Sequence, residues 1–373
     1  MESKRKKIFA SKIGGIPSYR VVSIDALRGF DMFWIVGGAV FFVNLLALFN
    51  IHTAQFGHSA WNGFTFWDLI FPLFIFIMGL SMTYSIGKRL ERGESRKNLY
   101  IHIVKRTLIL FILGLIYNGL LDFNFAAQRY AGVLQRIALC YFFASIIVMN
   151  ASIKWQAIWA AIILLFYWGI MMLIPVPGFG AGVLTPTGNL SAFIDQHFLP
   201  GSFCCYRFGD NEGIISTIPA ISTALIGVLA GHWLQTSFSQ LKKVLGLLLG
   251  GIAFIFIGLL WNFVFPINKL IWTSSYVLYA SGWSLLLFCL FYWLIDVRGW
   301  QSWAFPFVVI GLNSITIYLC TALFNFSIIA NIFIHGFSPH LGIYQPLFLV
   351  ICTLAVEWFF LYFLFKRKIF LKV

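Results

Sequence analysis

Charged residues are scarce in this sequence of 373 residues: Asp, Glu, Lys and Arg make up 10% of it, against about 25% in a typical soluble domain. Cysteine is scarce as well, with 6 residues whose spacing is not that of a zinc site, so no metal is expected. Hydrophobic residues instead make up 60%. These figures exclude a water-soluble domain, a disordered chain and a disulfide-rich secreted scaffold.

Long apolar runs account for this composition. A helix needs about 20 mostly apolar residues to cross a membrane. Ten runs approach that length: 30–50, 64–86, 107–121, 132–150, 155–174, 214–235, 244–265, 274–295, 303–333 and 346–365. The ninth is long enough to contain a break, for which Pro306 and Gly311 are the candidates. The sequence therefore predicts an all-α, polytopic integral membrane helix bundle with about ten transmembrane helices.

Basic residues are unevenly distributed among the loops. If the N-terminus is cytoplasmic, that side holds 22 of the 26 Lys and Arg residues, and the opposite side holds only Arg129, Arg136, Arg207 and Lys269. Positive residues concentrate on the cytoplasmic side of membrane proteins, so both termini are expected in the cytoplasm. The same rule accounts for the net charge of +14, and no nucleic-acid partner is expected.

The predicted organisation is simple. We expect a basic cytoplasmic N-terminus over 1–29, one transmembrane domain over 30–365 and a basic cytoplasmic tail over 366–373. The extracytoplasmic connection at 175–213 is long enough to carry a small cap over the outer face. The compact length favours a protein of the inner membrane of a bacterium. The lipid bilayer is therefore an expected partner.

Ionisable residues at membrane depth are costly and need a partner or a function. Asp25 and Arg28 share one helical face, so they form either a structural ion pair or a site that offers Arg28 to an anion. Arg136 lies on the side with few basic residues, where it either extends to the surface or serves a ligand. Asn313 is expected to be buried with a hydrogen-bond partner. Glu357 is assigned no role.

Histidines and carboxylates cluster at the predicted outer face. His52, His58, Asn62 and Asp68 lie between the first two spans together with two Trp residues. Histidine exchanges protons near neutral pH, and Asn62 and Asp68 are placed to orient His58. The alternative is an interfacial Trp belt with incidental polar residues, which is the preferred interpretation for His52.

Two acids precede the sixth span. Asp210 and Glu212 either complement the positive end of that helix, bind an amino group or polarise His58. Asn268 and Lys269 begin another outer loop, before the eighth span.

Several motifs occur in a distinctive order. They are Asp25-x-x-Arg28-Gly29, His58-x-Ala-Trp-Asn62-Gly, Asp68 with the apolar run to Gly79, Gly132-Val-Leu-Gln135-Arg136, Glu212-Gly213 with Ser216-Thr-Ile, Asn268-Lys269, and Gly311-x-Asn313-Ser. This order resembles the heparan-α-glucosaminide N-acetyltransferase family over about 20–365. The stretch 58–79 is the most specific part. The chain departs from the family at Asn211, where Asp-Pro-Glu-Gly is usual.

The resemblance implies an N-acetyltransferase that moves an acetyl group from cytosolic acetyl-CoA to an amino sugar, a glucosamine-type glycan, on the far side of the membrane. It implies that His58 is the essential histidine, and it also suggests a homodimer. The candidate site residues fall into three groups. They are the catalytic His58, Asn62 and Asp68; the acetyl-CoA-binding Arg28, Arg106, Gln135, Arg136 and Asn313; and the substrate-binding Asp210, Glu212, Asn268 and Lys269.

The expected chemistry is acyl transfer with His58 as general base, while Asn62 or a backbone amide donates to the oxyanion. An acetyl-histidine intermediate is the alternative. A long donor with anionic phosphates fits a bundle about 30 Å thick whose cytoplasmic side is basic. The rival function is a transporter of small molecules or glycan precursors, since intramembrane charges and broken helices occur there too. The absence of an inverted repeat favours the acyltransferase.

Overall fold

The structure is a computed structural model that describes residues 21–371, apart from the side chains of 90–91. Most of the basic segment predicted over 1–29 and the last two residues of the predicted tail therefore lie outside the described residues. Two compact units divide the chain. Among the described residues, unit 1 comprises 21–53 and 287–371, and unit 2 comprises 54–286. The single transmembrane domain predicted over 30–365 stays a prediction.

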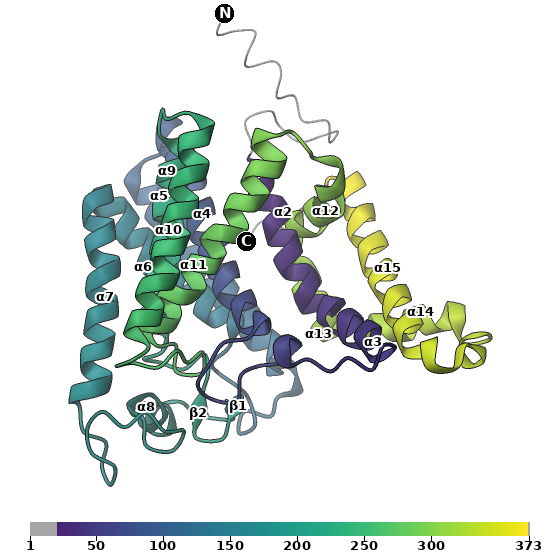
Figure 1. The fold of residues 1–373 in the computed structure, drawn as a ribbon, viewed down its shortest axis with the longest axis horizontal. Coiled ribbons are helices and arrows are strands. Elements are labelled where there is room, and N and C mark those ends of the chain that lie inside the picture. The colour runs from purple at the N-terminus through teal and green to yellow at the C-terminus, as the bar shows by residue number, and fades with distance from the viewer. Residues whose placement is uncertain (1–20, 372–373) are drawn as a thin grey trace, which may run out of the picture. The chain divides into compact units, whose positions relative to one another are not determined.

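Helices make up most of both units (Figure 1). Unit 1 begins with α2 (Val22–Phe33), the π-helical segment η1 (Trp34–Gly38) and α3 (Ala39–Ala47). It resumes in the last turn of α11 and continues through η4 (Tyr292–Val297), η5 (Ser302–Ala304), α12 (Phe305–Leu312), α13 (Ser314–Leu323), α14 (Phe326–Ile334), η6 (Ser338–Tyr344) and α15 (Gln345–Lys366).

Unit 2 contains the remaining elements. In chain order they are η2 (Ala54–Phe56), α4 (Phe66–Glu91), α5 (Arg96–Tyr117), η3 (Leu120–Asp122), α6 (Val133–Asn150), α7 (Ile153–Leu173), α8 (Leu190–Phe198), the hairpin of β1 (Cys205–Tyr206) and β2 (Gly209–Asp210), α9 (Thr217–Gln235), α10 (Gln240–Trp261) and α11 (Ser274–Phe291). The strands pair antiparallel, with Cys205 opposite Asp210.

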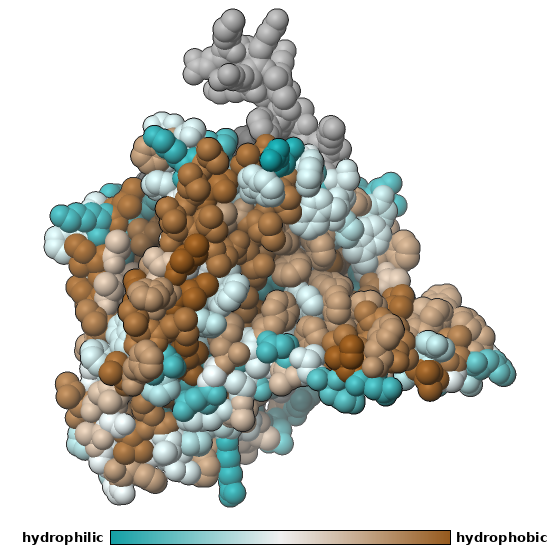
Figure 2. Space-filling view, viewed as in Figure 1, coloured by the Kyte–Doolittle hydropathy of each residue, from teal (hydrophilic) through white to brown (hydrophobic). Residues whose placement is uncertain are grey.

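The predicted number of spans is confirmed. Within residues 21–371, nine helices are long and apolar enough to cross a membrane, and one bent helix pair raises the number to ten. The protein is therefore an all-α, multi-pass membrane protein. Figure 2 shows hydrophobic residues over the middle of the unit 2 helices that face the viewer, with hydrophilic residues toward their ends. The third span is longer than predicted, because α5 continues back to Arg96.

The predicted break in the ninth span exists, but its predicted cause was wrong. α12 and α13 meet at an angle of 62°, and the residue between them is Asn313, whose φ of −127° and ψ of 33° are not helical. Pro306 lies in the first turn of α12, where proline is tolerated. Gly311 serves packing instead, because a methyl group there would lie 1.9 Å from the carbonyl oxygen of Asp25 on α2.

Close helix packing also organises unit 2. A methyl group at Gly79 of α4 would lie 1.9 Å from the carbonyl oxygen of Ala224 on α9, and one at Gly227 would lie 2.0 Å from that of Phe76. The two backbones therefore touch, which only small residues allow. This contact sets α4 and α9 side by side, so that loops before each helix meet at the same end of the unit.

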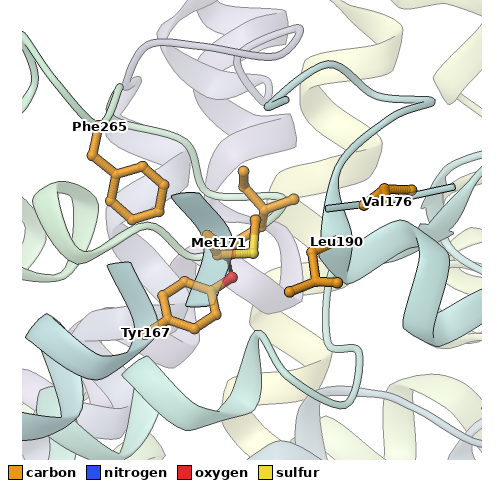
Figure 3. Close-up of a cluster of buried hydrophobic side chains, with 6 residues drawn as sticks. Tyr167, Met171, Val176, Leu190 and Phe265 are labelled. Carbon is orange, nitrogen blue, oxygen red and sulfur yellow. Dashed lines mark hydrogen bonds between the residues drawn. The ribbon is translucent and has the colours of Figure 1, made fainter. Parts of the chain in front are cut away.

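We call that end the loop end; it consists of the segments 54–65, 118–132, 174–216 and 262–273, with α8, β1 and β2 among them (Figure 1). The long connection predicted at 175–213 is folded there. A buried apolar cluster supports it: Figure 3 shows Tyr167 and Met171 of α7 between Phe265 on one side and Leu190 and Val176 on the other.

The cluster also fixes the loop between α10 and α11. The Tyr167 hydroxyl donates to the carbonyl oxygen of Ile271, and Trp61 packs against the cluster while its indole donates to the carbonyl oxygen of Leu184 at 2.9 Å. The segments that carry His58, Asn62, Asn268 and Lys269 are thus held by a common apolar support.

Candidate active site

Asp68 is the residue around which the loop end is built. The α4 helix opens with Thr65 and Asp68 in a capping box, because the Asp68 N–H donates to Thr65 Oγ1 at 3.3 Å and the Thr65 N–H donates to Asp68 Oδ2 at 3.1 Å. The Thr65 hydroxyl and the Ser59 N–H also donate to Oδ2, at 3.1 and 3.2 Å. The side chain is fully buried. Its negative charge lies at the positive end of α4, where it is stabilised.

His58 contacts the other oxygen of this carboxylate. Its Nδ1 lies 2.8 Å from Asp68 Oδ1. A carboxylate can only accept, so this contact assigns the proton to Nδ1 and leaves the lone pair on Nε2. Among the described residues Nε2 has no hydrogen-bond partner, and the His58 side chain is 40% exposed. The imidazole is oriented on one side and accessible on the other, as a general base requires.

Lys269 is buried beside Nδ1 of His58. Its Nζ is 3.1 Å from His58 Nδ1 and 3.5 Å from Asp68 Oδ1, and its side chain is 6% exposed. Burial lowers the pKa of Lys269, while the charges of Asp68 and Glu212 oppose that shift. Lys269 thus forms one cluster with His58 and Asp68.

Within the described part of the chain Asn62 is hydrogen-bonded to Asn268 and not to His58, contrary to the expectation that it orients the ring. Its Oδ1 accepts from Asn268 Nδ2 at 3.1 Å, and Asn268 Oδ1 accepts from the Ile271 N–H at 3.1 Å. The second bond fixes the Asn268 amide, which in turn fixes that of Asn62. The amide nitrogen of Asn62 is the group left to donate, on an exposed side chain.

The two predicted acids form a buried ion cluster with Arg129. Its Nε and Nη2 donate to both oxygens of Asp210, at 2.7 and 2.6 Å, and Nη2 also donates to Glu212. Burial acts to lower the pKa of Arg129, but the hydrogen bond and charges of the two acids raise it above its usual value. Both acids precede α9, as expected, but neither lies in its first turn, and the N-cap residue is Ser216.

Asp195 of α8 supports this ion cluster. Its carboxylate accepts from the Asp210 N–H at 3.2 Å and from the Ile214 N–H at 2.9 Å. Burial raises its pKa to about 6, although both backbone bonds oppose the shift. Gly213 lies directly against it, since a methyl group there would be 2.0 Å from Asp195 Oδ2.

Arg136 is 1% exposed, so the alternative that it extends to the surface was wrong. Its Nη2 donates to Ser216, and its guanidinium carbon lies 4.7 Å from the centre of the Trp272 ring. Nε and Nη1 are buried without a hydrogen-bond partner in the described part of the chain. Trp272 itself is fully buried and has a φ of 52°, a strained value for a bulky residue.

Two further residues that were predicted to bind acetyl-CoA, Gln135 and Arg106, lie on the helices of unit 2. Gln135 is 3% exposed, and neither atom of its amide has a hydrogen-bond partner among the described residues. Arg106 of α5 lies over the Tyr141 ring at 4.5 Å. Together with Arg136, these side chains carry buried N–H groups without a hydrogen-bond partner among the described residues. A polar ligand could accept hydrogen bonds from them.

Unit 1 carries Arg28 and Asn313, the other two residues that were predicted to bind acetyl-CoA. Arg28 pairs with Asp25 at 3.3 Å, so the predicted ion pair is confirmed. Asn313 is 2% exposed, as expected, and its Nδ2 donates to the carbonyl oxygen of Ile369 at 3.1 Å.

Sequence reasoning missed Thr65, Arg129 and Asp195. Thr65 was recognisable, because Thr65-x-x-Asp68 before an apolar run is a capping-box pattern. Arg129 had a weaker signal: it is one of the few basic residues on the predicted outer side. Asp195 had none, since only the folded 174–216 segment brings it to Asp210. Among the described residues, no group of three or more His, Cys, Asp or Glu is arranged to hold a metal.

A family model matches the part of the sequence that carries most of these residues. The model for "Heparan-alpha-glucosaminide N-acetyltransferase, catalytic" matches residues 20–258, which include His58, Asp68, Arg129 and Glu212. The chain belongs to this family. The match ends before Asn268 and Lys269, which the fold brings to Asn62 and His58, respectively.

Curated relatives extend the similarity. The heparan-alpha-glucosaminide N-acetyltransferase of Mus musculus is 30% identical, over 71% of this chain and 48% of the mouse protein. That of Homo sapiens is 29% identical, over 80% of this chain and 52% of the human protein. The chain thus spans about half the length of the curated relatives it matches.

Proposed function

We propose that the protein transfers an acetyl group from acetyl-CoA to the amino group of a glucosamine-type sugar, with His58 as general base. The observation that carries this proposal is the contact between His58 Nδ1 and Asp68, which directs the free Nε2 of an exposed imidazole away from the carboxylate. Family membership supports acetyl transfer over the transporter alternative.

The proposed reaction begins when the acceptor amine attacks the thioester carbonyl. His58 Nε2 removes the proton that the amine loses, and Asp68 stabilises the resulting imidazolium through Nδ1. The Asn62 amide nitrogen donates to the oxyanion of the tetrahedral intermediate. The intermediate collapses as the carbon–sulfur bond breaks, and the imidazolium returns its proton to the departing thiolate of coenzyme A.

The remaining polar groups have supporting places in this proposal. Arg136 and Gln135, which are buried with donors unused, are suited to carbonyl oxygens of the donor's pantetheine arm. Asp210 and Glu212 are engaged by Arg129, so we propose that they shape the acceptor site through that cluster. We further propose that the loop end faces the extracytoplasmic side, which the distribution of Lys and Arg supports.

The test is acetyl transfer by the purified protein from acetyl-CoA to a panel of amino sugars. His58→Gln should lower the rate by at least about 100-fold, the usual contribution of a general base. His52→Gln is the matched control, because it alters an exposed histidine in the same connection and should keep the wild-type rate. Full activity in His58→Gln, or no transfer to any amino sugar by the wild type, would overturn the proposal.

The acetyl-histidine alternative has its own signature. A covalent intermediate returns its acetyl group to free coenzyme A, so labelled coenzyme A should enter the acetyl-CoA pool without any acceptor. Direct transfer predicts no such exchange until an acceptor is added.

A further inference from the structure

Glu357 is a buried acid on α15, one of the helices that are long and apolar enough to cross a membrane. The residue is 4% exposed, and its Oε2 is buried without a hydrogen-bond partner among the described residues. An ionisable group at membrane depth needs a partner or a function. The proposed acetyl transfer does not use Glu357, so its position needs another explanation.

Glu357 lines a cavity of about 390 Å3 that lies entirely within unit 1. Side chains of α2, η1, α12, α13 and α15 surround this cavity. Its lining includes the buried Ile310 and Leu361 and the exposed Pro306 and Phe359, so the cavity reaches from the interior of the unit to its surface. The volume falls in the range of small-molecule sites, about 300–1,000 Å3.

The lining of this cavity is complementary to a cation. Among the described residues Glu357 is its one ionisable side chain, and every other lining residue is apolar. Four of the apolar residues are aromatic, namely Phe33, Phe307, Trp358 and Phe359. The faces of aromatic rings attract cations, and a carboxylate does so more strongly. An acid among aromatic rings therefore has the chemistry that binds an ammonium group.

The neighbours of Glu357 hold this wall of the cavity in place. The Trp358 indole N–H donates to the carbonyl oxygen of Pro306 at 3.3 Å, which joins α15 to the first turn of α12. The Trp358 ring also packs edge-on against Phe305 and stacks on Tyr362, with ring centroids 6.4 and 5.0 Å apart. The cavity is thus already formed, so a ligand can bind without rearranging the helices.

We propose that this cavity binds a single-chain amphiphile with a protonated amino group, whose N–H donors pair with the Glu357 carboxylate while its hydrocarbon chain lies along the apolar lining. The ammonium group supplies the positive charge and the hydrogen-bond donors that the described lining lacks. A zwitterionic phospholipid headgroup does not suit the cavity, because its phosphate would be left without a cation. The occupant is therefore an amine of the bilayer that carries no phosphate.

The experiment compares dodecylamine, 1-dodecanol and lauroyl lysophosphatidylethanolamine, whose chains have equal length. Native mass spectrometry of the full chain, released from micelles of a non-ionic detergent, measures the apparent Kd of each. The wild type should bind dodecylamine about tenfold more tightly than the other two, which is the added value of a charge-assisted hydrogen bond. Glu357→Gln keeps the shape of the side chain and should remove the preference for the amine.

Two further variants locate the site on α15. Ala355 lines the cavity, so Ala355→Phe should fill part of it and weaken the binding of dodecylamine and 1-dodecanol alike. Cys352 lies on the same helix but does not line the cavity. Cys352→Ala is therefore the matched control and should bind all three amphiphiles as the wild type does.

Four outcomes would overturn the inference. They are equal wild-type affinities for the amine and the alcohol, which would identify a groove for lipid chains; binding of the lysophospholipid as tight as that of the amine; a preference for the amine that persists in Glu357→Gln; and binding that Ala355→Phe leaves unchanged. None of these measurements involves acetyl transfer, so the inference and the proposed function stand or fall separately.

Discussion

At the scale of single residues, the distinctive feature is a carboxylate shared by a histidine and a lysine. Asp68 accepts from His58 Nδ1, so the Lys269 ammonium cannot donate to the same protonated nitrogen and is left to pair with Asp68 at 3.5 Å. Its charge nevertheless lies 3.1 Å from the ring. The side chains of Lys269 and Asp68 are both buried, so each charge compensates the other where water does not reach.

Lys269→Met should therefore lower the stability of the folded protein by roughly 3 kcal/mol, because removing one partner of a buried ion pair leaves the charge of the other uncompensated. Thermal unfolding in detergent measures the change, and Arg207→Gln, which alters an exposed cation of the same loop end, is the control. A Lys269→Met variant as stable as the wild type would mean that Lys269 does not balance the charge of Asp68.

At the scale of elements, α8 and the β1–β2 hairpin hold the ion cluster through one buried acid. Asp195 keeps two backbone N–H groups bonded in a segment that otherwise consists of turns and short strands. The carboxylate pays a desolvation cost for that position, which is why its pKa rises from 3.8 to about 6. The folded state therefore holds the Asp195 proton more tightly than the unfolded state does.

This raised pKa predicts a pH dependence of stability. For an acid whose pKa rises on folding, stability is greatest where both states are protonated, falls between the two pKa values and is constant above the higher one. The stability of the wild type relative to Asp195→Asn should thus fall by about 1–2 kcal/mol between pH 5 and pH 7. Thermal unfolding in detergent measures it, with exposed Asp122→Asn as control. A difference independent of pH would contradict the expectation.

At the scale of the whole molecule, hydropathy alone predicts most of the architecture. The apolar runs locate the spans because each must cover about 30 Å of hydrocarbon. Their ends were less predictable: α5 begins at Arg96 because Ser95 caps it through the Asn98 N–H, a local bond that a hydropathy window cannot detect. The break at Asn313 was assigned to Pro306 or Gly311, but Pro306 lies in the first turn of α12 and Gly311 is constrained by its contact with α2.

The site was predictable only in part, for a physical reason. Asp68 lies ten residues from His58, so their contact is visible in the sequence. Lys269 lies 211 residues from His58, and Arg129 lies 81 from Asp210. Contacts at such separations depend on how loops fold over helix ends, which composition and periodicity do not determine.

Sidedness also belongs to the whole molecule. Cys205 is exposed at the loop end, so an impermeant maleimide should label it in intact cells if that end faces outward. Cys205→Ser should remove most of the label, and Cys140, which is buried, should stay unlabelled until the protein is denatured. Labelling only after permeabilisation would place the loop end in the cytoplasm and reverse the proposed orientation.

The capping box of α4 has a consequence for sequence divergence. One side chain closes the helix, anchors the preceding loop and aligns the imidazole, and all of its partners are donors. Asparagine would turn an N–H2 group toward some of those donors, and glutamate would displace both oxygens by a bond length. Position 68 should therefore tolerate less substitution than the residues that face the acceptor. In distant homologues, an aspartate at this position together with the histidine should indicate an active enzyme more reliably than the histidine alone.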